Sequence, residues 1–283
     1  MTDMARQEAD ALAAINRAIR ADPVAPLCRY FAEWPIDEFG ALFLRDLSAY
    51  PDLRHRLPRM PPAETQRAFN FYDGAEMMER SVGFMRFLKT HYERTTARDL
   101  ADARVLDYGA GWGRMARMML QFIPDERVHA CDAAPRAVEL YNSLGFRRAA
   151  DLIATVPASL PYESGQFDLI WLFSVLTHLP EYAADAAMHA LLPVVESTGL
   201  LVVTVHPAEF WETNPIVSHD VSVQEMLRLH RETGFAHYPS HDGGVWGDTS
   251  MTPDYMARRW PEWRVLGAEE EEGHQVGVLL QRA

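Results

Sequence analysis

The chain has 283 residues, with 27 Lys and Arg against 40 Asp and Glu, so its formal net charge is −13 at pH 7. Nucleic acids and anionic membranes attract basic surfaces, so this acidic balance disfavours both as main partners. No apolar run reaches the roughly 18 residues of a membrane-spanning helix. The two cysteines, Cys28 and Cys131, are typical of a reducing compartment. We therefore expect a globular, cytoplasmic protein.

The first 94 residues are predicted to form a helical region whose helices are separated by prolines. Residues 3–20 have apolar side chains at helical spacing, and a second helix is expected between Pro35 and Pro51. A proline-rich loop at 58–62 follows. Residues 75–92 place apolar side chains along one helix face: Met78, Val82, Met85 and Leu88. This pattern favours a core-facing helix over a flexible, methionine-rich binding surface.

From residue 104 onward, short apolar strands alternate with helices. Strands are expected at 104–106, 127–130, 152–155, 167–173 and 200–205, and helices at 113–122, 135–144 and 181–195. Such alternation predicts an α/β fold with a doubly wound, mostly parallel, seven-stranded sheet. Two final strands, 263–266 and 275–280, are expected to form an antiparallel hairpin at the sheet edge. We divide the chain into a helical region, 1–94, and a catalytic domain, 95–283.

A glycine-rich loop, VLDYGAGWG at 105–113, connects the first strand to its helix. Glycines let a backbone approach a ligand closely, and the strand-to-helix switch places the ligand at the carboxyl edge of the sheet. The spacing differs from that of dinucleotide enzymes, because Arg114 stands where their third glycine would be. Asp107, ahead of the loop, suits a cation better than a phosphate. Asp132, at the end of the second strand, could bind both ribose hydroxyls, although a capping role is the structural alternative.

These residues resemble the motifs of class I S-adenosylmethionine-dependent methyltransferases, whose fold is Rossmann-like. VLDYGAGWGR is similar to the first motif, Asp132 to the ribose-binding acid, and SLPYESGQFDLIWLFSVLTHLPE to the middle block. STGLLVVTVHP resembles the fifth-strand block, with Ser197 and Thr198 where Pro-Gly is usual. The P-P-x-E-x-Q stretch at 61–66 and the tail GHQVGVLLQR are similar to bacterial methyltransferases found among glycan and small-molecule modification genes.

The resemblance implies S-adenosylmethionine as the cofactor and methyl transfer as the activity. In the family pattern, the backbone of Gly109–Gly111 lines the methionine moiety, Asp107 supports its ammonium group, and Asp132 binds the ribose. The implied cofactor residues are Asp107, Tyr108, Gly109, Ala110, Gly111, Asp132, Ala133, Leu160, Phe173 and Ser174. Val156 and Pro157 stand where the family often has an acid for the adenine amine, so this contact must come from the backbone or another side chain.

Two histidines are candidate general bases, because a hydroxyl acceptor must lose a proton as the methyl group transfers. His178 follows the strand at 167–173, and His206 directly follows the strand at 200–205. The structural alternative for each is a histidine that bonds the backbone. Five of the eleven histidines fall within 206–241, near Asp220 and Asp242, but their spacing matches no compact metal-ligand motif, so no metal is expected. The stretch 207–253 is read as a long functional loop.

We therefore expect a methyltransferase that acts on a small-molecule or glycan acceptor at a hydroxyl group. A binding or regulatory subunit that holds S-adenosylmethionine without catalysis is the first alternative. A nicotinamide-dependent oxidoreductase is the second, since it would use a similar nucleotide-binding sheet.

Overall fold

The structure is a computed structural model that describes residues 3–213, 223–240, 244–270 and 275–283. Its main sheet has seven strands in the order β3-β2-β1-β4-β5-β9-β8. Their bounds are β1 (Val105–Tyr108), β2 (Val128–Asp132), β3 (Asp151–Leu152), β4 (Phe167–Leu172), β5 (Val195–Val205), β8 (Trp263–Glu270) and β9 (Val276–Arg282). Strands β1 to β5 pair in parallel, whereas β9 runs antiparallel to both β5 and β8. The predicted mostly parallel sheet with a C-terminal antiparallel hairpin is confirmed.

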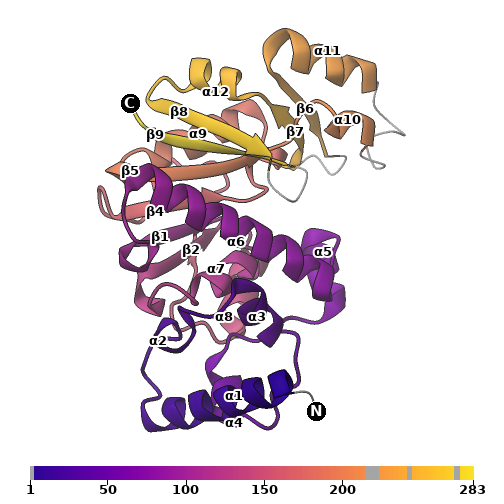
Figure 1. The fold of residues 1–283 in the computed structure, drawn as a ribbon. Coiled ribbons are helices and arrows are strands. Elements are labelled where there is room, and N and C mark those ends of the chain that lie inside the picture. The colour runs from indigo at the N-terminus through magenta and orange to yellow at the C-terminus, as the bar shows by residue number, and fades with distance from the viewer. Residues whose placement is uncertain (1–2, 214–222, 241–243, 271–274) are drawn as a thin grey trace.

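The sheet is buried on both faces, and alternate residues of its strands enter two different hydrophobic cores. Leu169 and Trp171 of β4 join the core on the side of α6 (Gly74–Thr96) and α7 (Arg114–Met119). Ile170 and Leu172 join the core on the side of α9 (Glu181–Leu191) and α12 (Pro253–Arg259). This is the two-residue period of a strand, and it explains why 167–172 is a nearly continuous apolar run. Helix α8 (Pro135–Ser143) follows β2 (Figure 1).

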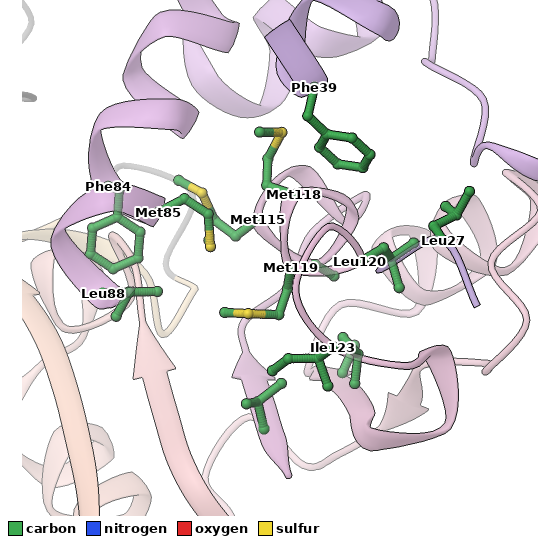
Figure 2. Packing of buried hydrophobic residues seen from close by; sticks show 14 of the residues in the cluster. Leu27, Phe39, Phe84, Met85, Leu88, Met115, Met118, Met119, Leu120 and Ile123 are labelled. Atoms are coloured by element: carbon green, nitrogen blue, oxygen red, sulfur yellow. The ribbon is translucent and has the colours of Figure 1, made fainter. Parts of the chain in front are cut away.

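Helix α6 packs along the sheet and against α7 (Figure 1). Figure 2 shows Phe84, Met85 and Leu88 of α6 close to the methionines of α7 in one apolar cluster. Met85 and Leu88 are fully buried, as are the methionines of α7. The sulfur-rich face of α6 is therefore core packing, as predicted, and the binding-surface alternative is excluded.

The prolines of the N-terminal region start helices more often than they end them. The helices there are α1 (Asp3–Ala21), α2 (Cys28–Phe31), α3 (Ile36–Leu42), α4 (Pro51–Arg56) and α5 (Ala63–Asn70). Pro51 was expected to stop a helix, but it is the first residue of α4, a position where its missing N–H costs nothing. Helix α3 already ends at Leu42. Helix α5 directly follows Pro62, so the segment after the predicted loop is helical as well.

The stretch 207–253 is not a simple loop, which corrects the sequence expectation. It holds α10 (Phe210–Thr213), α11 (Val223–Thr233), β6 (Phe235–Pro239) and β7 (Gly247–Met251), and β6 and β7 form a separate antiparallel pair. The polar residues of β6 and β7 hid these strands, because the buried Thr249 and Ser250 of β7 satisfy their hydroxyls by hydrogen bonds to other side chains. Strand β5 also starts earlier than predicted, at Val195, and α9 ends at Leu191. Among the described residues, none of the helices combines the length and apolar character needed to span a bilayer.

Candidate functional site

The glycine loop between β1 and α7 has a left-handed backbone at all three glycines. The φ angles are 77° at Gly109, 56° at Gly111 and 82° at Gly113, a region that side chains rarely adopt. A Cβ at Gly109 would lie 2.4 Å from Cγ2 of Val175, and one at Gly113 would lie 2.5 Å from Cζ of Phe146. Only Gly111 has room, since its nearest neighbour would be a ring carbon of Phe69 at 3.6 Å. Gly111 is thus the least crowded of the three loop glycines, and the Phe69 ring lies beside it.

Asp132, at the carboxyl end of β2, is bonded directly to this loop. Its Oδ2 accepts a hydrogen bond from the Gly111 N–H at 2.8 Å, and its Oδ1 accepts one from the Ala134 N–H at 2.8 Å. Burial raises the pKa of its carboxyl group. Each carboxylate oxygen has two lone pairs, so Asp132 keeps acceptor capacity for two hydroxyl donors. This geometry suits a ribose beside Gly111.

Asp107 lies beneath the loop rather than in it. Its side chain is 2% exposed, and its Oδ2 accepts from the Ala116 N–H of α7 at 3.1 Å. Burial raises the pKa of this carboxyl to about 7. The contact ties the first turn of α7 to β1 and so orients the glycine loop. The predicted contact of Asp107 with an ammonium group stays a prediction.

The segment that follows β4 packs over the glycine loop. The Phe173 ring lies 4.4 Å from the Phe84 ring, measured between centroids, and the guanidinium of Arg114 lies 4.8 Å from the Phe173 ring centre. Ser174 has a left-handed φ of 57°, and its N–H donates to Thr204 Oγ1 at 2.8 Å. Strained backbone of this kind clusters at functional sites.

The remaining predicted cofactor residues are divided between the two cores, with Ala110 in the core of α6 and α7 and the others on the side of α9. Tyr108 and Leu160 are buried in the apolar cluster of α9, and Ala133 packs against that cluster. Ala110 is also buried, and its N–H donates to the Cys131 carbonyl, as does that of Gly109. Val156, which stands where the family often has an acid for the adenine amine, is 42% exposed.

His178 ends the short 3₁₀ helix Leu176–His178, three residues beyond the valine that packs on Gly109. Its Nδ1 lies 2.9 Å from the carbonyl oxygen of Gly247 and 3.9 Å from Oδ1 of Asp248. A carbonyl oxygen only accepts, so Nδ1 carries the proton and Nε2 keeps its lone pair in the neutral ring. The side chain is 35% exposed. His178 is thus an accessible imidazole with its basic nitrogen free of this contact.

His206 lies beside His178 but in a different environment. The two ring centres are 6.3 Å apart, and the His206 ring stacks on Phe210 at 3.7 Å. Burial, together with the nearby His178, lowers the pKa of His206 to about 3. The structure therefore brings both candidate bases to one edge of the sheet but makes His206 a very weak base.

The surroundings of His178 are aromatic and weakly acidic. The Trp246 ring lies 6.5 Å from the His178 ring and is 41% exposed. Burial raises the pKa of Asp248, and His178 opposes this shift. The partly exposed indole of Trp246 presents an aromatic face beside His178 on which a planar ring can stack.

The other histidines of 206–241 do not converge on a common centre. His230 Nδ1 pairs with Ser250 Oγ at 2.7 Å, and His237 Nδ1 pairs with Thr249 Oγ1 at 2.7 Å. His219, Asp220, His241 and Asp242 lie outside the described residues. Within the described part of the chain, no three His, Cys, Asp or Glu side chains are grouped so that they could hold a metal ion.

Sequence reasoning missed two residues that organise this edge. Gly247 provides the carbonyl for His178 from 69 positions further along the chain. Arg117, fully buried, donates to the backbone carbonyls of Pro58, Arg59, Trp112 and Gly113 and so joins the N-terminal region to the glycine loop. In the sequence, Arg117 stands out only as a charged residue among the methionines Met115, Met118 and Met119, and Gly247 does not stand out at all.

A cavity of about 220 Å³ lies away from this edge, among the N-terminal helices. It is lined by residues of α3, α4 and the segments beside them, and none of them belongs to the glycine loop or to β7. It does not contribute to the site described above.

The residues at the carboxyl edge fit S-adenosylmethionine. Asp132 has acceptor capacity for the ribose hydroxyls, Gly111 is the least crowded of the three loop glycines, and the Gly109 and Ala110 N–H groups are held by the Cys131 carbonyl. A dinucleotide would instead need free N–H groups at the helix N-terminus for its pyrophosphate, whereas the Ala116 N–H is taken by Asp107.

Comparisons with known proteins agree with this geometry. Residues 105–199 match the family model described as "Methyltransferase domain". The structure is similar to the PH0226 protein of Pyrococcus horikoshii OT3, with 11% identity, 75% of this chain and 93% of that one covered, and a TM-score of 0.54. It is also similar to magnesium protoporphyrin IX methyltransferase of Synechocystis PCC 6803, with 14% identity, coverage of 78% and 94%, and a TM-score of 0.50. A search of curated protein sequences finds no match.

Proposed function

We propose that the chain is a class I S-adenosylmethionine-dependent methyltransferase that methylates a hydroxyl group of a small-molecule or glycan acceptor, with His178 as the general base. The observation that carries the proposal is the contact between His178 Nδ1 and the Gly247 carbonyl, which leaves Nε2 able to accept a proton. The match of residues 105–199 to the methyltransferase family model supports the activity, whereas the acceptor class and the role of His178 rest on the site geometry.

S-adenosylmethionine supplies an electrophilic methyl group whose transfer needs no further activation of the donor. The protein's own part is to position the acceptor and to remove its proton. Asp132 and the Gly111 backbone hold the nucleoside, and Val175 packs the segment of His178 onto the same loop. His178 therefore stands on the acceptor side of the cofactor, where a base within hydrogen-bond reach of a hydroxyl is needed.

His206 is the second candidate base, and its burial argues against it. With a pKa lowered to about 3, its ring stays neutral at physiological pH but takes up a proton only weakly. Efficient bases have pKa values near the working pH. We assign His206 to packing against Phe210 and to shaping the wall beside His178.

The N-terminal region, 1–94, is proposed to cap the cofactor. Phe69 of α5 is the nearest neighbour of the open face of Gly111. An aromatic side chain at this place can cover the ligand and shield the transferring methyl group from water.

The first test is calorimetric titration of the purified chain with S-adenosylhomocysteine and, separately, with NAD. We expect micromolar binding of S-adenosylhomocysteine, about −8 kcal/mol, and no binding of NAD. The reverse result would favour the oxidoreductase alternative.

The second test measures S-adenosylhomocysteine release with separate panels of phenols, sugars and amines. Turnover with a hydroxyl panel is expected, and His178→Asn should lower it about 10²- to 10⁴-fold while leaving S-adenosylhomocysteine affinity unchanged. His206→Asn is the matched variant and should keep most of the turnover. Full turnover in His178→Asn, with a rate that is flat between about pH 5.5 and 8, would contradict a histidine base. Binding without turnover on any panel would favour the regulatory alternative.

A further inference from the structure

Strand β7 contacts the segment that carries His178 at two neighbouring points. His178 Nδ1 lies 2.9 Å from the Gly247 carbonyl oxygen, and Thr249 Oγ1 donates to the Leu179 carbonyl at 2.8 Å. The first contact involves the imidazole itself, and the second holds the residue that follows it. Two contacts at successive residues restrain both the position and the rotation of the segment.

The second contact belongs to a hydrogen-bond chain that can run in only one direction. The Leu179 carbonyl only accepts, so the single proton of the Thr249 hydroxyl points to it. Thr249 Oγ1 must then accept from His237 Nδ1, which lies 2.7 Å away on β6. Thr249 is fully buried, so water does not compete for these bonds. The chain therefore fixes β6, β7 and the His178 segment in one arrangement.

The first contact depends on the close approach of β6 and β7 at Gly247. A Cβ at this position would lie 2.2 Å from the Tyr238 carbonyl oxygen and 2.6 Å from Cε1 of His237. Both distances are far below van der Waals contact, and the Tyr238 oxygen is backbone that cannot turn away. Any side chain at 247 would push the start of β7 off β6 and move the carbonyl that faces His178.

We propose that β7 is the positioning strand of the acceptor site: Gly247, through its carbonyl, and Thr249, through its hydroxyl, hold His178 with its proton on Nδ1 and its lone pair on Nε2. The inference rests on the proposed function for its catalytic meaning, because a base with the opposite tautomer would present a proton to the acceptor. Gly247 and Thr249 are positioning residues, since they act through His178.

The test reads the tautomer directly, from the imidazole nitrogen shifts of histidine-labelled full-length protein at about pH 8, where an ordinary histidine is neutral. The His178 signals are assigned by their loss in His178→Asn. In the wild type, His178 should be the Nδ1–H tautomer. In Gly247→Ala, the ratio of this tautomer to the other should fall about 2- to 10-fold, the value of one lost hydrogen bond.

Gly267→Ala is the matched control, because Gly267 lies on β8 with no atom within 4 Å of its would-be Cβ. It should leave the His178 signals as in the wild type. An unchanged His178 tautomer in folded Gly247→Ala would overturn the role of Gly247.

Thr249 provides an independent pair of variants in case Gly247→Ala does not fold. Thr249→Val removes the hydroxyl at nearly constant volume and should change the His178 tautomer ratio in the same direction. Thr249→Ser restores the hydroxyl and should restore the ratio, which a purely structural loss of packing would not do. A wild-type ratio in Thr249→Val would overturn the role of Thr249.

The same variants separate this inference from the proposed function. If His178 is the Nδ1–H tautomer and responds to β7 as expected, the positioning role stands even if His178→Asn keeps its turnover; only the base role would then fail. If His178→Asn loses turnover, but the His178 tautomer ratio in Gly247→Ala and in Thr249→Val equals that of the wild type, the base role stands and the positioning inference fails.

Discussion

At the scale of single residues, the proposed cofactor site at the carboxyl edge of the sheet depends on one glycine without a side chain and on two buried carboxylates. Gly111 is the least crowded glycine of the loop, Asp132 accepts a hydrogen bond from that loop, and Asp107 lies under it. Each makes a different contribution, so each can be changed separately.

Gly111→Val should abolish S-adenosylhomocysteine binding while the protein stays folded. Valine would occupy the open face toward Phe69 and would force a β-branched residue to a φ of 56°. Gly74→Val is the matched control, since Gly74 has a φ of 55° and no atom within 4 Å of its would-be Cβ. Titration calorimetry compares the two, and wild-type affinity in Gly111→Val would place the cofactor elsewhere.

Asp132→Ala should weaken S-adenosylhomocysteine binding by about 1.5 to 3 kcal/mol, the range for hydrogen bonds to a charged group. The variant loses the acceptors for a ribose and also the bonds to Gly111 and Ala134. Asp132→Asn keeps one acceptor oxygen and should fall between alanine and the wild type. Equal affinity of all three proteins, measured by calorimetry, would be inconsistent with a ribose at Asp132.

Asp107→Asn should stabilise the protein at alkaline pH. Burial raises the pKa of Asp107 from 3.8 to about 7, so the folded state binds more protons than the unfolded state between these values. The contribution of this carboxyl to stability is therefore full below about pH 4 and is lost as the pH rises to 7. Melting temperatures of variant and wild type should diverge over this window and run parallel above it. A constant difference at all pH values would refute the shifted pKa.

At the scale of elements, Arg117 joins α7 to the segment between α4 and α5. Its guanidinium is completely buried, and its hydrogen bonds go to backbone carbonyls of the glycine loop and of Pro58 and Arg59. Burial lowers its pKa to about 9, so it stays a cation at neutral pH. Three aromatic rings also face it. The N-terminal region and the cofactor loop are thus connected through one charged group.

Arg117→Met should lower the free energy of unfolding by about 2 to 4 kcal/mol, because it leaves several buried carbonyls without donors. Arg117→Lys keeps the charge but not the planar fork, so its loss should be smaller. Arg136→Met, at an exposed position of α8, is the control and should change stability by less than about 0.5 kcal/mol. Urea unfolding measures all three, and a neutral Arg117→Met would refute the connecting role.

At the scale of the whole molecule, the N-terminal helices and the sheet share one hydrophobic core. Phe84, Met85 and Leu88 of α6 lie in the same cluster as Trp171 and Leu169 of the sheet. The boundary that the sequence predicts at residue 94 follows a change in sequence pattern. In the structure this boundary falls within the last turn of α6, which packs on the sheet.

A fragment of residues 95–283 should therefore fail to fold cooperatively, since it exposes the face that α6 covers. A chain that lacks residues 1–21 removes only α1, whose packing is mainly against α4, and should fold and bind S-adenosylhomocysteine. Circular dichroism melts and dye binding distinguish the two. A cooperative melt of the 95–283 fragment would show that the domain is independent of its cap.

Much of the fold could be predicted from local pattern. The strands β1, β2, β4 and β5 and the parallel sheet followed from apolar runs alternating with helices, because burial on both faces requires such runs. The N-terminal prolines and the β6–β7 pair were misread. Proline is compatible with both ends of a helix, and a strand whose polar groups pair with each other has no apolar alternation to detect.

The candidate cofactor residues could be named from the sequence, whereas the different environments of the two histidines could not. Gly109, Gly111 and Asp132 lie in short motifs whose chemistry depends on chain neighbours. His178 and His206 each follow a strand, and only the family resemblance, which places the segment after the fourth strand beside the methyl group, favours His178. Only tertiary packing buries one against Phe210 and gives the other the Gly247 carbonyl, 69 residues away. Local spacing identifies candidate residues. Burial and long-range hydrogen bonds, which depend on the folded chain, set the basicity and the tautomer of each histidine.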